Sequence, residues 1–243
     1  MQVAVLGLGE AGARLAADLV EAGCTVRGWD PARASETESA GAAVRGADVV
    51  LSVNSASVAI EAAAGVAGQL RSDALYADLN TSSPELKREL AGVVPVDFVD
   101  VALVGVVPLT GLATPALASG SGAERFAALF GPLGMPVEVV GDRPGEAAGL
   151  KLLRSVFMKG VAAAAIEALE AAKSAGAEAR VRSDIAGVLG EPMLDRFLDG
   201  SRVHAVRRAE EMRAAAAYLE QLGVPPRVAS AAADWFDHLR SAP

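Results

Sequence analysis

The chain has 243 residues, of which 52% are hydrophobic and 21% charged, and its formal net charge is −8 at pH 7. This length and apolar content exclude a disordered or fibrous class and support one large domain or two smaller ones. The acidic balance argues against nucleic acid or an anionic membrane surface as the main partner. The single cysteine, Cys24, excludes an internal disulfide framework and suits a reducing compartment.

The sequence shows no targeting or membrane-spanning pattern. Periodicity begins at Gln2, before a signal peptide would fit, and no apolar run reaches the length of a membrane span without a glycine or a charge. We therefore expect a soluble, cytoplasmic protein. Cys24 is expected to be a small buried residue where a turn meets a strand, rather than a reactive thiol.

The first 140 residues alternate between short β-branched runs and helical stretches. Most of the runs are apolar along their length, as strands covered on both faces must be. This alternation predicts an α/β fold with a doubly wound parallel sheet. The predicted strands are residues 2–7, 25–30, 48–54, 74–80, 96–102 and 137–141, and the predicted helices are 10–22, 56–69, 83–91 and 122–131.

The chain changes character after Gly145. Residues 146–176 lack proline and are rich in alanine and leucine, which predicts one interdomain helix about 45 Å long. We expect a dinucleotide-binding domain over 1–144 and an interdomain helix plus an all-α domain over 145–243. The helical part beyond the long helix has a thin core, which favours a homodimer through the C-terminal helices. Helix breaks are predicted at Gly190-Glu191-Pro192, Gly200-Ser201 and Gly223-Val224-Pro225-Pro226.

A glycine-rich turn lies between the first predicted strand and helix, where Gly7, Gly9 and Gly12 form a G-x-G-x-x-G pattern. In this context the pattern is typical of a dinucleotide site, because the helix that follows turns its positive end toward a pyrophosphate. A glycine-rich turn without a ligand is the alternative. The predicted cofactor-binding residues of the turn are Gly7, Leu8, Gly9, Glu10, Ala11 and Gly12.

Asp30 ends the second predicted strand, where a carboxylate accepts hydrogen bonds from the adenosine ribose. A carboxylate also repels a 2′-phosphate and so favours NAD over NADP. Arg33 leaves NADP open, because a guanidinium binds phosphate well. Pro31 leaves open a turn role for Asp30 without any ligand.

Two further loops follow parallel strands, at the edge where ligands bind in such sheets. Their polar side chains are predicted to line the ribose and nicotinamide, and helix capping is the alternative role in both loops. Ser82 or Ser83 can provide that cap in the second loop. The side chains in question are Asn54, Ser55, Asn80 and Thr81.

Four segments together resemble the β-hydroxyacid dehydrogenase and 6-phosphogluconate dehydrogenase superfamily. They are GLGEAG at 7–12, DLNTSSP at 78–84, DVALVG from residue 100 and GEAAGLK at 145–151. The C-terminal part resembles the short helical domain of its phosphogluconate-dehydrogenase-like subgroup. The resemblance implies a Rossmann domain, a long interdomain helix and usually a dimer. It also implies reversible NAD(P)-linked oxidation of a hydroxyl in an interdomain cleft.

The resemblance assigns a catalytic role to Lys151, which stands six residues after Gly145 as the family's lysine does after its glycine. The family lysine is the general acid/base on the substrate oxygen. The positive end of the helix dipole disfavours the charged form of a lysine so placed, which suits a proton acceptor. Ser155 stands where the family has asparagine, and we predict that it contacts the substrate. A surface lysine is the alternative for Lys151.

The substrate loop departs from the family pattern. The family's Ser-Gly-Gly falls on Val104-Gly105-Val106, so the serine that would hold a substrate carboxylate is missing. This favours a larger or less acidic substrate, with Thr110 and Thr114 as the nearby polar side chains. A solvated helix face, with Glu211 paired to Arg207 or Arg208, is the alternative for the more distant candidates. The predicted substrate-binding residues are Gly105, Arg154, Lys159, His204 and Arg208.

The predicted function is hydride transfer between nicotinamide and the hydroxyl or carbonyl carbon of a hydroxyacid-like small molecule. An imine reductase is one alternative, although those enzymes usually carry aspartate or tyrosine in place of the lysine. A non-catalytic dinucleotide sensor is another. No metal is expected, because one cysteine and two distant histidines form no ligand cluster.

Overall fold

The computed structural model describes residues 1–241, so the end of the predicted second domain, 242–243, lies outside the described residues. Contacts divide the chain into two compact units, Met1–Lys151 and Leu152–Pro243. Helix α7 (Glu146–Ser174) passes through the division as one continuous helix, in agreement with the predicted long helix. The domain boundary at 144/145 and the homodimer stay predictions.

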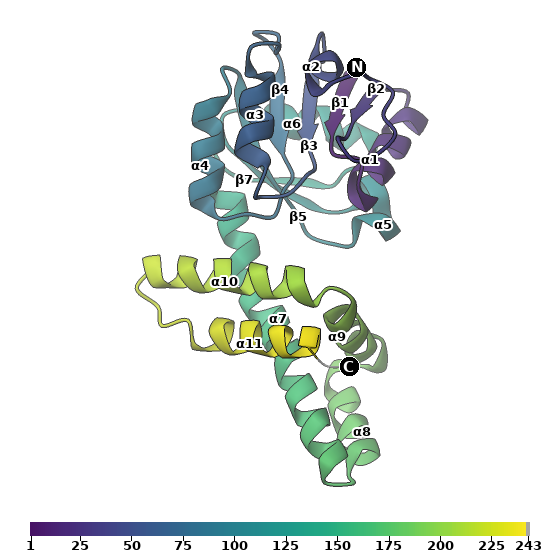
Figure 1. Cartoon of the computed structure of the whole chain (residues 1–243), viewed down its shortest axis with the longest axis vertical. Coiled ribbons are helices and arrows are strands. Elements are labelled where there is room, and N and C mark those ends of the chain that lie inside the picture. The colour runs from purple at the N-terminus through teal and green to yellow at the C-terminus, as the bar shows by residue number, and fades with distance from the viewer. Residues whose placement is uncertain (242–243) are drawn as a thin grey trace. The chain divides into compact units, whose positions relative to one another are not determined.

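The first unit is built on a seven-stranded sheet with the order β2-β1-β3-β4-β5-β6-β7 (Figure 1). The strand pairs are parallel except for β5 with β6. The predicted doubly wound α/β sheet is confirmed, but its wholly parallel form is wrong at this one pair. The strands are β1 (Gln2–Leu6), β2 (Thr25–Trp29), β3 (Val49–Ser52), β4 (Leu75–Asp78), β5 (Asp97–Leu103), β6 (Ala116–Ser119) and β7 (Val137–Gly141).

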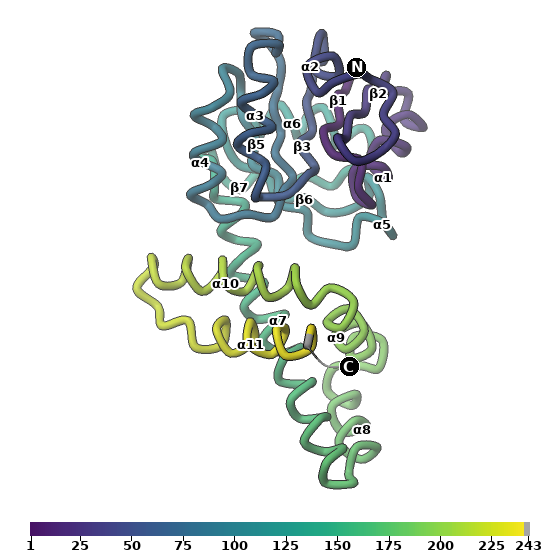
Figure 2. The backbone as a smooth tube through the Cα atoms, viewed as in Figure 1, coloured from purple at the N-terminus to yellow at the C-terminus, as the bar shows by residue number. Residues whose placement is uncertain are grey.

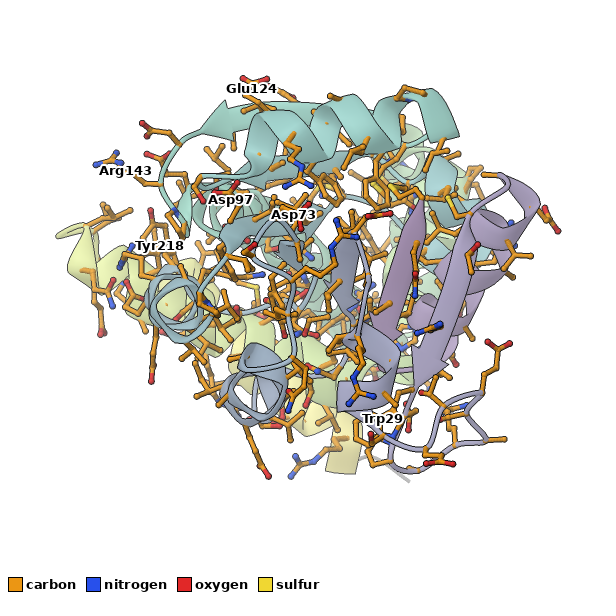
Figure 3. All side chains as sticks on the ribbon, turned by 90° about the horizontal axis from the view of Figure 1, so that it is seen from above. Trp29, Asp73, Asp97, Glu124, Arg143 and Tyr218 are labelled. Carbon is orange, nitrogen blue, oxygen red and sulfur yellow. The ribbon has the colours of Figure 1, made fainter. Side chains whose placement is uncertain are left out.

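Helices cover both faces of this sheet. One face packs against α1 (Glu10–Glu21), α5 (Val107–Thr110) and α6 (Ala123–Phe130), and the other against α2 (Ala40–Val44), α3 (Ala59–Ala67) and α4 (Pro84–Val93). Figure 3 shows the two faces from above, with Glu124 of α6 on one side and Trp29 at the end of β2 on the other. The predicted helices are confirmed, but α2 and α5 were missed because five and four residues are too few to show a helical period.

The second unit is all-helical, as predicted, and its core is lined by leucine, alanine, Met212 and Phe236. Helices α10 and α11 run antiparallel side by side (Figure 1), and Figure 2 traces the turn between them. Gly190 and Gly223 have φ of 80° and 73°, which a glycine adopts without strain, and they end α8 and the α10 segment as predicted. The helices that follow α7 are α8 (Glu178–Leu189), α9 (Glu191–Val203), α10 (Ala205–Gln221) and α11 (Arg227–Ser241).

The predicted helix break at Gly200-Ser201 is wrong, because α9 continues through both residues and the break falls at His204. The Ser201 hydroxyl donates to the Phe197 carbonyl one turn earlier, so it does not compete with the helix. A Cβ at Gly200 would lie 2.6 Å from Nη2 of Arg208, so the glycine makes room for that side chain.

Phe130 offers a test of the first unit's core. Phe126 and Phe130 are fully buried and stack with 4.2 Å between ring centroids. Phe130→Ala is expected to lower the free energy of unfolding by about 3–5 kcal/mol, measured by urea denaturation. The control Leu109→Ala removes a side chain that is 76% exposed, and it should change stability by less than about 0.5 kcal/mol. Equal losses in the two variants would contradict this packing.

Candidate functional site

The turn between β1 and α1 is crowded at its first and third glycines and open at its second. Gly7 has a φ of 102°, and a Cβ there would lie 2.4 Å from the Val53 carbonyl oxygen. A Cβ at Gly12 would lie 1.9 Å from the Gly7 carbonyl oxygen, whereas a Cβ at Gly9 would meet no atom within 4 Å. These are the requirements of a tight turn, close helix packing and backbone approach by a pyrophosphate. The residues present therefore fit a dinucleotide.

Asp30, directly after β2, connects this turn to the next loop. Its Oδ2 accepts a hydrogen bond from the Leu8 amide at 2.7 Å, and its Oδ1 accepts one from the Ala32 amide at 2.8 Å. Arg33 is exposed on the same loop. The carboxylate thus stands at the carboxyl end of β2 beside the glycine-rich turn, as the sequence predicts, and its contact with ribose stays a prediction.

The loops after β3 and β4 are joined by side-chain amides. Asn80 Nδ2 donates to Asn54 Oδ1 at 2.8 Å. Ser55 is exposed, and its hydroxyl bonds that of Ser57 at 2.9 Å. Glu10 and Ala11 lie in the first turn of α1. The structure therefore brings Asn54 and Asn80 together at the carboxyl edge of the sheet, while Ser55 bonds within its own loop.

Lys151 reaches the same edge from α7. Its Nζ donates to Oγ1 of Thr81 at 2.8 Å, and Thr81 is exposed in the loop after β4. Both residues belong to the first unit. The Lys151 amine of α7 therefore reaches the loops that follow the parallel strands β3 and β4. These loops carry the Thr81 hydroxyl and the Asn54–Asn80 pair.

Beneath this edge lies a buried ionic group that the sequence analysis missed. Lys87 Nζ contacts Asp78 Oδ2 at 2.6 Å and Asp100 Oδ1 at 3.1 Å, and all three residues are fully buried. Burial alone would lower the pKa of Lys87, but the charges and hydrogen bonds of Asp78 and Asp100 outweigh it and raise the pKa. Lys87 is therefore held as a cation.

Asp100 also caps α7. Its Oδ2 accepts hydrogen bonds from the amides of Gly145 and Ala148 at 3.2 and 2.9 Å, and from the Ser119 hydroxyl at 3.3 Å. Ser119 Oγ accepts a bond from the Ala147 amide at 3.0 Å. A carboxylate is favourable at the positive end of a helix. One signal for this group stands in the sequence: Lys87 interrupts the apolar face that Pro84 and Leu90 define on α4.

The second unit contains a separate polar cluster. Ser155 Oγ donates to Glu211 Oε1 at 2.5 Å, and Lys159 forms an ion pair with the same carboxylate. Burial is the main reason that the pKa of Lys159 is lowered; Glu211 opposes the shift, and Arg208 and Arg207 add to it. The sequence offered Arg207 or Arg208 as an alternative partner for Glu211, and the structure pairs Glu211 with Lys159 of α7.

His204 and Arg208 lie one helical turn apart at the start of α10, where the Arg208 amide donates to the His204 carbonyl oxygen at 2.9 Å. His204 lies between α9 and α10, and Arg208 Nη1 donates to the Ser201 hydroxyl at 2.6 Å. The guanidinium also lies 5.9 Å from the ring centroid of Phe236. These contacts join α9, α10 and α11. Arg154 is exposed on α7, and contact of these residues with a substrate stays a prediction.

The segment after β5 is less polar than its two threonines suggest. The hydroxyls of Thr110 and Thr114 lie 2.5 Å apart and bond each other, and Thr114 is fully buried. A Cβ at Gly105 would lie 3.0 Å from Thr114 Cγ2, so the glycine packs against this threonine. Val106 is exposed. The segment therefore presents mainly apolar groups.

Comparison with known proteins agrees with this geometry. Residues 2–114 match the NAD binding domain of 6-phosphogluconate dehydrogenase, and residues 160–239 match a domain of unknown function, DUF1932. A conserved protein of unknown function, with reported structural similarity to 3-hydroxyacid dehydrogenases, is 30% identical. That match covers 99% of this chain and 97% of the other, with a TM-score of 0.77.

Two more distant structures share the fold. The 3-hydroxyisobutyrate dehydrogenase of Mycobacterium tuberculosis, solved with L-serine, is 22% identical with a TM-score of 0.81, over 99% of this chain and 94% of that one. An imine reductase variant of Myxococcus stipitatus, solved with NAD+, is 22% identical with a TM-score of 0.68, over 99% and 93%.

The fold and the glycine-rich turn define an NAD(P)-binding Rossmann protein. The chain belongs to the 6-phosphogluconate dehydrogenase-like family, in the form that carries the DUF1932 domain after the NAD-binding domain. The resemblance stated from the sequence is thereby confirmed. Within residues 1–241, no helix is long and apolar enough to cross a membrane, and no group of three acidic, histidine or cysteine side chains is placed to hold a metal ion.

The glycine-rich turn yields a paired test. Gly9→Ala adds a methyl group to open space, so it should leave the unfolding temperature unchanged but weaken NADH binding about 10-fold, because the methyl occupies the path of the pyrophosphate. Gly12→Ala should lower both the unfolding temperature and the NADH affinity, because its Cβ would clash with the Gly7 carbonyl oxygen. NADH fluorescence titration and thermal melting measure the two effects. Undiminished NADH affinity in Gly9→Ala would show that the pyrophosphate does not approach here.

Asp30 sets the expected cofactor preference. Asp30→Ala removes an acceptor that serves a ribose but repels a 2′-phosphate, so NADH binding should weaken about 10-fold while NADPH binding changes less. Parallel titrations with NADH and NADPH measure the ratio. Equal losses for the two cofactors would remove Asp30 from the ribose site and leave its carboxylate with its bonds to the Leu8 and Ala32 amides.

Proposed function

We propose that this protein is an NAD(P)-dependent oxidoreductase that transfers a hydride between nicotinamide and the hydroxyl or carbonyl carbon of a hydroxyacid-like small molecule. Lys151 is the proposed general acid/base. The observation that carries the proposal is the 2.8 Å hydrogen bond from Lys151 Nζ to Thr81 Oγ1. This bond supports the proposal because it holds the Lys151 amine at the carboxyl edge of the parallel strands, where open α/β sheets bind their ligands.

The chemistry divides between the cofactor and the chain. The bound cofactor supplies a nicotinamide ring that accepts or returns a hydride. In the oxidative direction, neutral Lys151 takes the hydroxyl proton while the hydride leaves the adjacent carbon, so that one O–H and one C–H bond break as the carbonyl forms. In the reductive direction, the Lys151 ammonium returns the proton to the carbonyl oxygen. Thr81 accepts a hydrogen bond from the amine and so orients it.

Ser155 is the second proposed substrate contact, and its bonding limits what it can recognise. The hydroxyl already donates its proton to Glu211, and it accepts from Lys159 Nζ at 3.3 Å. It therefore has only acceptor capacity left. This favours a substrate that donates a hydrogen bond at this point, such as a hydroxyl, over one that presents a carboxylate.

The apolar segment after β5 supports the same substrate class. Val104 stands where the family's carboxylate-binding serine would be, and the nearby Thr110 and Thr114 hydroxyls are bonded to each other. The proposed substrate therefore has a hydroxyl as its reacting group and an apolar or weakly polar part in place of a short carboxylate arm. An imine reductase is the second candidate, because an enzyme of that class shares the fold. Lys151 favours the hydroxyl substrate.

Lys151 provides the test of this proposal. Lys151→Met should reduce turnover by at least about 100-fold, because the variant lacks the proposed proton acceptor, while NADH affinity stays within about twofold. The assay follows NADH absorbance with wild-type protein over hydroxy acids, sugar acids and cyclic imines, and then compares the variant on the substrate found. Lys173→Met, which removes an exposed lysine from the last turn of the same helix, is the matched control.

Two results would contradict the proposal. Undiminished turnover in Lys151→Met would remove the lysine from catalysis. Turnover of cyclic imines alone, with every hydroxy acid inert, would assign the protein to the second candidate function.

A further inference from the structure

We propose that Lys87 is a positioning residue that couples the loops after β3 and β4, here called the cofactor-side loops, to the first turn of α7. The part of this inference that concerns Lys151 rests on the proposed function above. Lys87 lies on the buried face of α4 and is not expected to touch cofactor or substrate. Its effect would pass through two carboxylates, each of which holds a different part of the site.

The two carboxylates face each other across neighbouring strands. Asp78 and Asp100 are register partners on β4 and β5, and both are fully buried. Two like charges so placed repel each other strongly where water is absent. The Lys87 ammonium contacts both carboxylates and also donates to the Asp78 carbonyl at 2.8 Å. It therefore lies between the two carboxylates and offsets their repulsion.

Asp78 positions the cofactor-side loops through hydrogen bonds. Its Oδ1 accepts a hydrogen bond from Asn80 Nδ2 at 2.5 Å, and the same amide donates to Asn54 Oδ1 and to the Ser52 hydroxyl. The Asp78 carboxylate, as a pure acceptor, fixes which end of the Asn80 amide turns inward. The loops after β3 and β4 thereby take their relative position from the hydrogen bonds of Asn80 to Asp78 and Asn54.

Asp100 positions the start of α7 through hydrogen bonds. It accepts bonds from two amides at the start of α7, Gly145 and Ala148. Independently, Gly145 packs so closely on α4 that a Cβ there would lie 2.7 Å from the Pro84 carbonyl oxygen. The start of α7 is therefore seated on the start of α4, and Lys87 lies one turn further along α4. Because Lys151 lies in the second turn of α7, its position depends on how the start of α7 packs against α4.

The expected effect of Lys87→Met has a distinct pH dependence. The titratable groups that face one another are Asp78, Asp100 and the buried Tyr76 phenol, whose pKa is raised by burial and which stays neutral. Without the ammonium, one carboxyl would keep a proton in the folded state, so its folded pKa would lie above its unfolded value. Stability from such a group is present at low pH and is lost as pH rises through the folded pKa.

The first experiment therefore measures thermal melting of the whole chain from about pH 5 to pH 8. The difference in unfolding temperature between wild type and Lys87→Met should grow as the pH rises. Arg88→Met is the matched control, because Arg88 is the next residue on α4 and pairs with Glu85 in solvent. A loss in Lys87→Met that is the same at every pH would assign Lys87 a packing role and overturn the proposal.

The second experiment measures NADH binding by fluorescence. Lys87→Met should weaken NADH about 3- to 30-fold, and Arg88→Met should leave it unchanged. The double variant Lys87→Met/Asp100→Asn removes the charge imbalance while keeping an acceptor for the α7 amides, so it should recover most of the affinity. It also keeps the test open if the single variant does not fold. Unchanged affinity in Lys87→Met, or no recovery in the double variant, would overturn the proposal.

These readouts separate the two proposals. Melting and NADH binding need no substrate, so they decide the role of Lys87 even if no hydroxy acid is turned over. If a substrate is found, Lys87→Met should lower kcat more than it raises the substrate KM, because misplacement of Lys151 affects the proton transfer itself. Failure of the Lys151 test alone would leave the cofactor-side role of Lys87 standing.

Discussion

The first unit depends on one buried cation between two buried carboxylates. Lys87 contacts Asp78 on β4 and Asp100 on β5, and removal of one partner from such a group costs about 3–5 kcal/mol, a large part of the stability of a domain. Each carboxylate has a second task, because one orients an amide at the cofactor-side loops and the other caps α7. The buried Lys87–Asp78–Asp100 group thereby connects strands β4 and β5 to the loop after β4 and to the start of α7.

The cofactor turn shows how backbone geometry and side-chain chemistry divide one task. The glycines remove side chains where the chain folds on itself at Gly7 and Gly12 and leave open space at Gly9. Asp30 then connects the turn to the end of β2 through the Leu8 amide. Asn54 and Lys151 reach the same edge, so polar side chains lie along the side of the sheet where such sheets bind ligands.

The sequence correctly predicted those features that depend only on the local pattern of residues. Apolar runs located the parallel strands, and the glycine spacing located the tight turn between β1 and α1. Strand β6 was missed because Ala116–Ser119 has no β-branched or aromatic residue. The break at Gly200-Ser201 was wrong because contacts with Arg208 outweigh local propensity. The Lys87 group was missed because its members come from three segments, and only the register of β4 and β5 brings them together.

The capping of α7 has a consequence for the order in which the molecule is made. Asp100 and Ser119, which accept the amides of its first turn, both precede the helix in the chain. Since synthesis proceeds from the amino end, β5 and β6 leave the ribosome before α7 does. The acceptors for the first-turn amides of the helix that carries Lys151 are therefore synthesised before the helix itself.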